Sequence, residues 1–145
     1  MPPESTPTNG DHPEPLRPKM LIIDDSMPMR SLLSHIAGEL AFRADTAVDG
    51  RDGLEKLIKN DPRDPYTIAL VDWEMPEING LQLVQMLRRN PDFDGMKIML
   101  VTTMNSLERV VEALGAGANE YLMKPVSKES LSEKLQMLGL LDAAA

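Results

Sequence analysis

Short apolar runs alternate with longer stretches of mixed polarity along most of this 145-residue chain. Five runs have the length of strands, at residues 20–23, 42–48, 67–71, 96–101 and 120–123. Most are apolar without interruption, which is typical of strands buried on both faces of a parallel sheet, whereas residues 42–48 alternate between apolar and polar positions. The pattern therefore predicts five strands.

Between the strands, apolar residues recur at every third or fourth position, which is the spacing of a helix with one buried face. They predict five helices, at residues 26–40, 50–59, 81–89, 106–114 and 127–138. Strict alternation of strands and helices favours an α/β fold, in which helices cover both faces of a doubly wound parallel sheet.

Four residues on these helices carry specific expectations. The helical spacing places Leu32, Ile58 and Met86 among the buried residues. His35 falls on the first predicted helix, where we expect a partly exposed surface residue, because no four-helix bundle pattern accompanies it.

Composition narrows the possible functions. The chain has no cysteine, which excludes disulfides and thiolate metal sites. Its formal net charge of -8 argues against a surface that binds a nucleic-acid backbone. No apolar run approaches the roughly 18 residues of a membrane span, and the N-terminus lacks the apolar core of a signal peptide. We therefore expect a cytoplasmic protein that binds neither nucleic acid nor membrane.

The two ends of the chain differ from the rest. Residues 1–18 hold six prolines among small polar and acidic residues, with too little apolar surface to offset the entropy of ordering. We expect this segment to be a disordered tail and residues 141–145 to be a flexible C-terminus. Residues 19–140 have the length of one domain.

Polar side chains stand where four of the predicted strands end. The residues are Asp24 and Asp25, Asp72, Thr102, and Lys124. Because the carboxyl ends of parallel strands meet at one edge of the sheet, where ligands of such folds bind, these side chains are expected to lie together. Each alone has an ordinary explanation as a helix cap, a turn residue or a solvated strand end.

Taken together, these residues indicate phosphoryl chemistry. Carboxylates packed closely repel one another unless a cation lies among them, and oxygen ligands without cysteine or a suitable histidine favour Mg²⁺ or a similar ion. With a lysine and a hydroxyl added, such a site can neutralise the oxygens of a transferring phosphoryl group. Aspartate is a known covalent acceptor of that group, and Asp72 is the best placed because it follows a central apolar run and leads into a flexible loop.

The motifs resemble the receiver domain of two-component response regulators over about residues 18–140. The matching segments are the acidic pair Asp24-Asp25, "VDWEMPEINGL" around Asp72, "IMLVTT" with Thr102, and "ANEYLMKP" with Tyr121 and Lys124. The resemblance implies a flavodoxin-like (βα)5 fold with strand order 2-1-3-4-5.

The resemblance also implies roles for individual residues. Asp72 is then the phosphoacceptor, Thr102 and Tyr121 are the switch residues, and Lys124 is the lysine of the phosphorylation site. Mg²⁺ is implied to bind Asp25, Asp72 and the backbone carbonyl of Glu74, and Asp24 largely through water. The peptide bond between Lys124 and Pro125 is implied to be cis.

A single-domain chemotaxis-type regulator, acting as a monomer, is the implied function. A kinase phosphohistidine is the donor, and the surface of the fourth helix, fifth strand and fifth helix then changes its affinity for a protein target. Such a protein is a phosphoacceptor switch rather than an enzyme. Two alternatives remain: a receiver scaffold that works without phosphorylation, and an aspartate-nucleophile phosphohydrolase in which Glu74 is the second acid.

Overall fold

The computed structural model describes residues 17–142, so residues 1–16 of the predicted tail and residues 143–145 of the predicted flexible C-terminus lie outside the described residues. The strands are β1 (Lys19–Ile23), β2 (Arg43–Ala47), β3 (Ile68–Asp72), β4 (Lys97–Thr102) and β5 (Glu120–Met123). The helices are α1 (Met27–Glu39), α2 (Gly50–Lys59), α3 (Gly80–Arg88), α4 (Leu107–Ala116) and α5 (Lys128–Met137), with a short 3-10 helix, η2 (Pro91–Phe93), before β4. Strands and helices alternate as the sequence pattern predicts.

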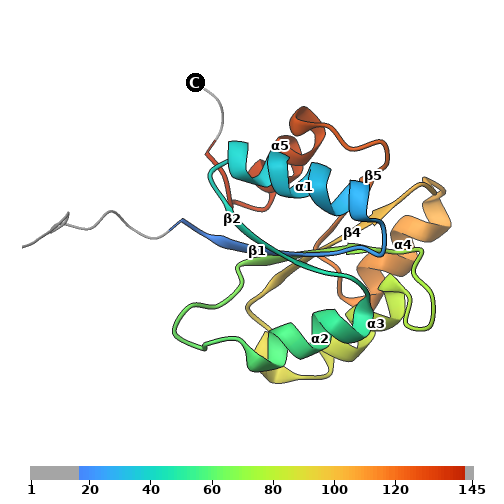
Figure 1. The fold of residues 1–145 in the computed structure, drawn as a ribbon. Coiled ribbons are helices and arrows are strands. Elements are labelled where there is room, and N and C mark those ends of the chain that lie inside the picture. The colour runs from blue at the N-terminus through green and yellow to red at the C-terminus, as the bar shows by residue number, and fades with distance from the viewer. Residues whose placement is uncertain (1–16, 143–145) are drawn as a thin grey trace, which may run out of the picture.

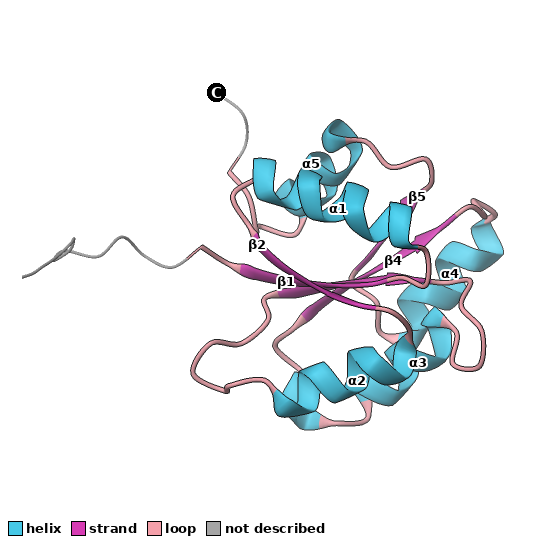
Figure 2. Ribbon diagram, viewed as in Figure 1, coloured by secondary structure: helices cyan, strands magenta, loops and turns pink. Residues whose placement is uncertain are grey.

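All five strands are parallel and lie in the order β2-β1-β3-β4-β5. Helices α1 and α5 cover one face of the sheet, and α2, α3 and α4 cover the other (Figures 1 and 2). The predicted doubly wound fold and its strand order are thus confirmed. Strand order reverses at β1 and β3, whose following helices cover opposite faces, so the carboxyl ends of these two strands are where ligands of such folds bind.

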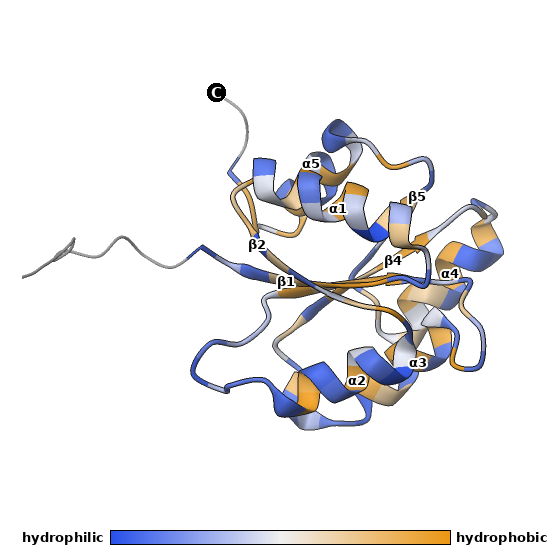
Figure 3. Ribbon diagram, viewed as in Figure 1, coloured by the Kyte–Doolittle hydropathy of each residue, from blue (hydrophilic) through white to orange (hydrophobic). Residues whose placement is uncertain are grey.

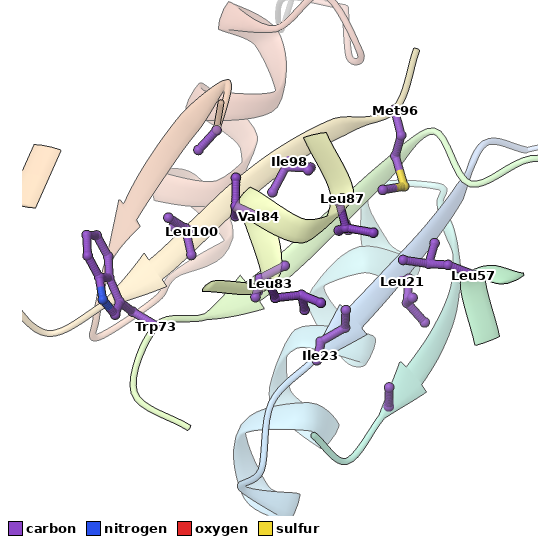
Figure 4. Packing of buried hydrophobic residues seen from close by; sticks show 14 of the residues in the cluster. Leu21, Ile23, Leu57, Trp73, Leu83, Val84, Leu87, Met96, Ile98 and Leu100 are labelled. Atoms are coloured by element: carbon purple, nitrogen blue, oxygen red, sulfur yellow. The ribbon is translucent and has the colours of Figure 1, made fainter. Parts of the chain in front are cut away.

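The two faces of the sheet have separate apolar cores. Every residue of β1 and β3 is buried, and these two strands are hydrophobic along most of their length, whereas the helices carry both polar and apolar residues (Figure 3). Leu33 of α1 and Leu131 of α5 belong to one cluster, and Leu83 of α3 belongs to the other. Trp73 packs at one end of the second cluster, beyond the end of β3 (Figure 4).

Each of the five α-helices starts at a side chain that caps it. The N-cap residues are Ser26, Asp49, Asn79, Ser106 and Ser127, and each accepts a hydrogen bond from the backbone N–H three positions ahead. Such caps satisfy N–H groups that would otherwise lack a partner at the helix start.

Three predicted core positions are wrong. Leu32, Ile58 and Met86 are 43%, 70% and 39% exposed. A helix that lies on a sheet buries only one stripe of its surface, and the residues next to these three along the chain occupy that stripe. His35 is exposed, as predicted, with its side chain beside Glu39.

Two strand boundaries differ from the prediction in a way that matters for the site. Asp72 and Thr102 are the last residues of β3 and β4, not the first residues after them. Their backbones are therefore held by the sheet.

Among residues 17–142, no helix is long and apolar enough to cross a membrane.

Candidate functional site

Three carboxylates meet at the carboxyl ends of the two central strands. Asp24 and Asp25 directly follow β1, and Asp72 ends β3, which pairs with β1. Each offers one carboxylate oxygen, and these oxygens all lie within 4.8 Å of one another. Asp24 and Asp72 are buried, at 1% and 3% exposure, whereas Asp25 is exposed. The cluster is thus open to solvent on the Asp25 side.

Asp24 is fixed from several directions. One of its carboxylate oxygens accepts a hydrogen bond from the backbone N–H of Ser26 at 2.9 Å, and its own N–H donates to the carbonyl of Ala47 at 3.2 Å. The guanidinium of Arg30 donates to the Asp24 carbonyl at 2.7 Å. The other carboxylate oxygen, Oδ2, is buried without a hydrogen-bond partner in the described part of the chain.

Lys124 is the cation of the cluster. Its Nζ lies 3.2 Å from Oδ1 of Asp72 and 3.8 Å from Oδ2 of Asp24. The backbone N–H of Lys124 donates to the carbonyl of Thr102 at 2.8 Å, which fixes the residue beside the end of β4. The Lys124–Pro125 peptide is cis, as the family resemblance implies.

Burial makes both buried carboxylates unusually basic. It raises the pKa of Asp72 to about 6, assisted by the charge of Asp24 and opposed by Lys124 and by the backbone N–H of Glu74. Burial also raises the pKa of Asp24, against the effects of the Ser26 N–H and of Lys124. One lysine therefore does not balance the negative charge of the cluster, and a further cation is favoured there.

The residues fit a divalent metal ion. Three carboxylate oxygens lie within reach of a common centre, and one of them, Oδ2 of Asp24, has no hydrogen-bond partner. All donors are hard oxygen atoms, which suit Mg²⁺, Ca²⁺ or Mn²⁺ and do not suit soft metals. The predicted carboxylate cluster is thus brought together as expected.

Thr102 reaches the same edge but does not bond to Asp72. Val101 pairs with Asp72 in the sheet, so Thr102 stands one residue further along the neighbouring strand, and it is 1% exposed. Its hydroxyl donates to Oε2 of Glu74 at 2.8 Å. A hydroxyl has one proton to donate, so in this structure the proton is used by Glu74.

Tyr121 lies one strand further from the cluster. It is in β5 and is partly buried, and Nζ of Lys134, in α5, lies 4.6 Å from the centre of its ring. Lys134 also forms an ion pair with Glu120 at 2.9 Å. The ring therefore contacts the layer of α5 rather than the carboxylates.

Sequence reasoning missed Arg109, and it considered the Glu74 side chain only as the second acid of a hydrolase, not as a partner of Thr102. Besides the bond from Thr102, the Glu74 carboxylate has Nη1 of Arg109 at 3.5 Å, and the Arg109 guanidinium lies 4.2 Å from the centre of the Trp73 ring. Arg109 is in the first turn of α4, 35 positions beyond Glu74. No spacing rule connects these two residues. The only signal in the sequence is that Arg109 lies near the start of the helix that follows a strand of the site.

Comparison with known proteins gives the same assignment as the geometry. Residues 20–136 match the response regulator receiver domain family. The chain is 33% identical over 120 residues to chemotaxis protein CheY1 of Helicobacter pylori, covering 83% of this chain and 95% of the relative. It is 34% identical over 118 residues to a chemotaxis protein CheY homolog of Campylobacter jejuni, covering 81% and 89%.

Solved structures agree. The chemotaxis response regulator CheY4 of Vibrio cholerae superposes with a TM-score of 0.77 at 30% identity, covering 84% of this chain and 98% of that one. The chain therefore belongs to the response regulator receiver domains, a family of phosphoacceptor switches rather than conventional enzymes.

Proposed function

We propose that this chain is a stand-alone response regulator that accepts a phosphoryl group on Asp72 from the phosphohistidine of a histidine kinase. The observation that carries the proposal is the position of Asp72. It is buried at the end of a central strand, 3.2 Å from the Lys124 ammonium, and it shares a cluster with Asp24 and Asp25. A carboxylate held this rigidly beside cationic groups is suited to attack a phosphorus atom.

The transfer step is an in-line displacement at phosphorus. A carboxylate oxygen of Asp72 forms the new P–O bond while the P–N bond to the donor histidine breaks, and the imidazole nitrogen leaves with the electron pair and takes up a proton. Lys124 stabilises the phosphoryl oxygens, and the hydroxyl of Thr102 then donates to one of them. Asp25, Asp72 and the Glu74 carbonyl would hold Mg²⁺, with Asp24 acting through water, and the ion would supply further positive charge to the site.

The switch connects this event to a surface. When Thr102 turns toward the phosphoryl group, Tyr121 moves to a buried position and the surface of α4, β5 and α5 changes its affinity for a protein target. Three exposed apolar side chains on α4, Leu107, Val111 and Leu114, lie on this surface. Exposed apolar groups in a row are common at protein interfaces.

The names of the relatives favour a role in chemotaxis, and we propose that the protein works as a cytoplasmic monomer. The two alternatives fit less well. The hydrolase interpretation needs Glu74 as a free acid, yet its carboxylate accepts from Thr102 and pairs with Arg109. The scaffold interpretation gives no use for the cluster of Asp24, Asp25 and Asp72 beside Lys124.

Transfer of labelled phosphate from a phosphorylated histidine kinase tests the proposal. The wild type should acquire one acid-stable, hydroxylamine-labile phosphoryl group in Mg²⁺, and the Asp72→Asn variant and the wild type in EDTA should acquire none. Labelling of Asp72→Asn at the wild-type rate would rule out this acceptor. Steady hydrolysis of phosphomonoesters would favour the hydrolase, and a failure of the wild type to respond to Mg²⁺ with beryllofluoride would favour the scaffold.

A further inference from the structure

The Glu74 carboxylate lies between a switch residue of the site and helix α4. Its Oε2 accepts the Thr102 hydroxyl at 2.8 Å and has Nη1 of Arg109 at 3.5 Å. Thr102 is buried, and the side chain of Glu74 is 41% exposed. The contact therefore joins the end of β4 to the first turn of α4 through a side chain of the loop after β3.

Arg109 is held in place by more than this ion pair. Its guanidinium lies 4.2 Å from the centre of the Trp73 ring, a distance typical of a cation–π contact. Trp73 is 5% exposed, and its backbone is tied by its N–H to the Val101 carbonyl and by its carbonyl to the N–H of Gly80, both at 2.9 Å. The tryptophan is therefore a fixed platform, and Arg109 on it holds the Glu74 carboxylate near Thr102.

The hydroxyl of Thr102 can donate only one hydrogen bond. In this structure Glu74 accepts it, and the oxygen of the same hydroxyl accepts from the backbone N–H of Met104 at 3.1 Å. A phosphoryl oxygen on Asp72 has to compete with Glu74 for that proton. The balance between these two acceptors then sets how readily the switch responds to a phosphoryl group.

We propose that Glu74 and Arg109 form a resting-state latch that holds Thr102 away from the phosphorylation site. Both are positioning residues, because they act on the phosphoryl group through Thr102. The inference rests on the proposed function, in which the Thr102 hydroxyl bonds to a phosphoryl group on Asp72. When that bond forms, Glu74 loses its contact with Thr102 and keeps only its contact with Arg109, so the link from the end of β4 through Glu74 to the first turn of α4 is broken.

A titration with beryllofluoride in Mg²⁺, used as a phosphoryl mimic, tests the latch. The readout is the amide resonance of Met104, whose N–H contacts the Thr102 hydroxyl and which is independent of the Trp73 fluorescence that Arg109 affects directly. Glu74→Ala removes the competing acceptor and should lower the midpoint roughly fivefold, the effect of a charge-assisted hydrogen bond at a partly exposed site. Glu77→Gln, which removes a charge from an exposed position of the same loop, should leave the midpoint within about twofold of the wild type.

A double-mutant cycle separates the latch from simple charge repulsion. In a Thr102→Val background there is no hydroxyl to hold, so adding Glu74→Ala should no longer lower the midpoint. If Glu74→Ala lowers it equally with and without the hydroxyl, Glu74 acts only by repelling the bound anion and the latch is wrong. The latch is also wrong if the midpoint of Glu74→Ala equals that of the wild type.

Arg109 gives an independent arm of the test. Arg109→Ala should lower the midpoint as well, by a smaller factor, and should add nothing to Glu74→Ala because both changes release the same hydroxyl. Full additivity, or no effect of Arg109→Ala alone, contradicts the latch. Failure of the proposed function has a different signature: the wild type would show no Met104 shift at any beryllofluoride concentration, or Asp72→Asn would respond like the wild type.

Discussion

The carboxylate that we assign as the phosphoacceptor is predicted to destabilise the metal-free protein at neutral pH. Burial and the charge of Asp24 raise the pKa of Asp72 from its ordinary value of 3.8 to about 6. The unfolded chain keeps the ordinary value, so the folded state binds a proton more readily and is penalised wherever the group is ionised. The penalty reaches its full value when the pH is above the pKa of Asp72 in the folded state. It is lost as the pH falls toward the pKa of Asp72 in the unfolded chain.

The variant Asp72→Asn measures this penalty, because an amide has the shape of the carboxyl group without its charge. The pKa difference corresponds to about 3 kcal/mol at pH 7.5, and coupling to Asp24 reduces this to an expected gain of about 2–3 kcal/mol in the free energy of unfolding. At pH 4.5 the gain should fall to roughly a third of that value, since the wild type is then largely protonated at Asp72 in the folded state.

Urea denaturation in EDTA, followed by circular dichroism at both pH values, gives the two free energies. Glu133→Gln removes a charge from an exposed position of α5 and serves as the control, with an expected change within about 0.5 kcal/mol at either pH. An Asp72→Asn protein no more stable than the wild type at pH 7.5 would contradict the argument, as would a gain of the same size at both pH values.

Three further predictions follow from the site and its support. Mg²⁺ at ten times its dissociation constant should stabilise the wild type by about 1.4 kcal/mol, and Asp25→Asn should reduce this gain in thermal unfolding at the same Mg²⁺ concentration. Gly80→Ala would place a Cβ 2.5 Å from a backbone oxygen of β3, so it should lower the free energy of unfolding, measured by urea denaturation, by about 2 kcal/mol or more. A Cβ at Gly95 meets nothing within 4 Å, so Gly95→Ala should leave this free energy nearly unchanged. Arg88 donates hydrogen bonds to three backbone carbonyls and one side-chain oxygen at 2.8 to 2.9 Å. Arg88→Ala should therefore lower the free energy of unfolding by about 3 kcal/mol in the same measurement. The control, Arg89→Ala at an exposed position, should lower it by less than about 0.5 kcal/mol.

The fold was largely predictable because its signals are local and repeated. Continuous apolar runs identify strands buried on both faces, and their alternation with amphipathic stretches leaves few arrangements other than a doubly wound parallel sheet. Capping residues such as Ser26 and Ser106 mark helix starts at the positions where the chain turns. The edge at which Asp24, Asp72 and Lys124 meet then follows from the rule that parallel strands end on the same side.

What the sequence did not predict depends on packing between elements. Leu32, Ile58 and Met86 fit the helical period, but the orientation of a helix on a twisted sheet decides which side of its apolar stripe meets solvent. Likewise, the end of β3 extends to Asp72 because β4 continues beside it, which no property of the β3 segment alone reveals. The contact of Glu74 with Arg109 needs both the loop conformation and the start of α4, and neither can be read from spacing.

The unphosphorylated site holds one group unfavourably and another favourably. Asp72 is ionised in a buried place beside Asp24, and the Thr102 hydroxyl is bonded to a glutamate rather than to the acceptor. On the proposed function, a phosphoryl group on Asp72 would replace the buried carboxylate by oxygens that Lys124 and Thr102 bind, and it would draw the Thr102 hydroxyl away from Glu74. On the latch proposal, the relief of the buried charge at Asp72 favours switching and the loss of the Thr102–Glu74 hydrogen bond opposes it, so removing Glu74 should make the switch easier to turn.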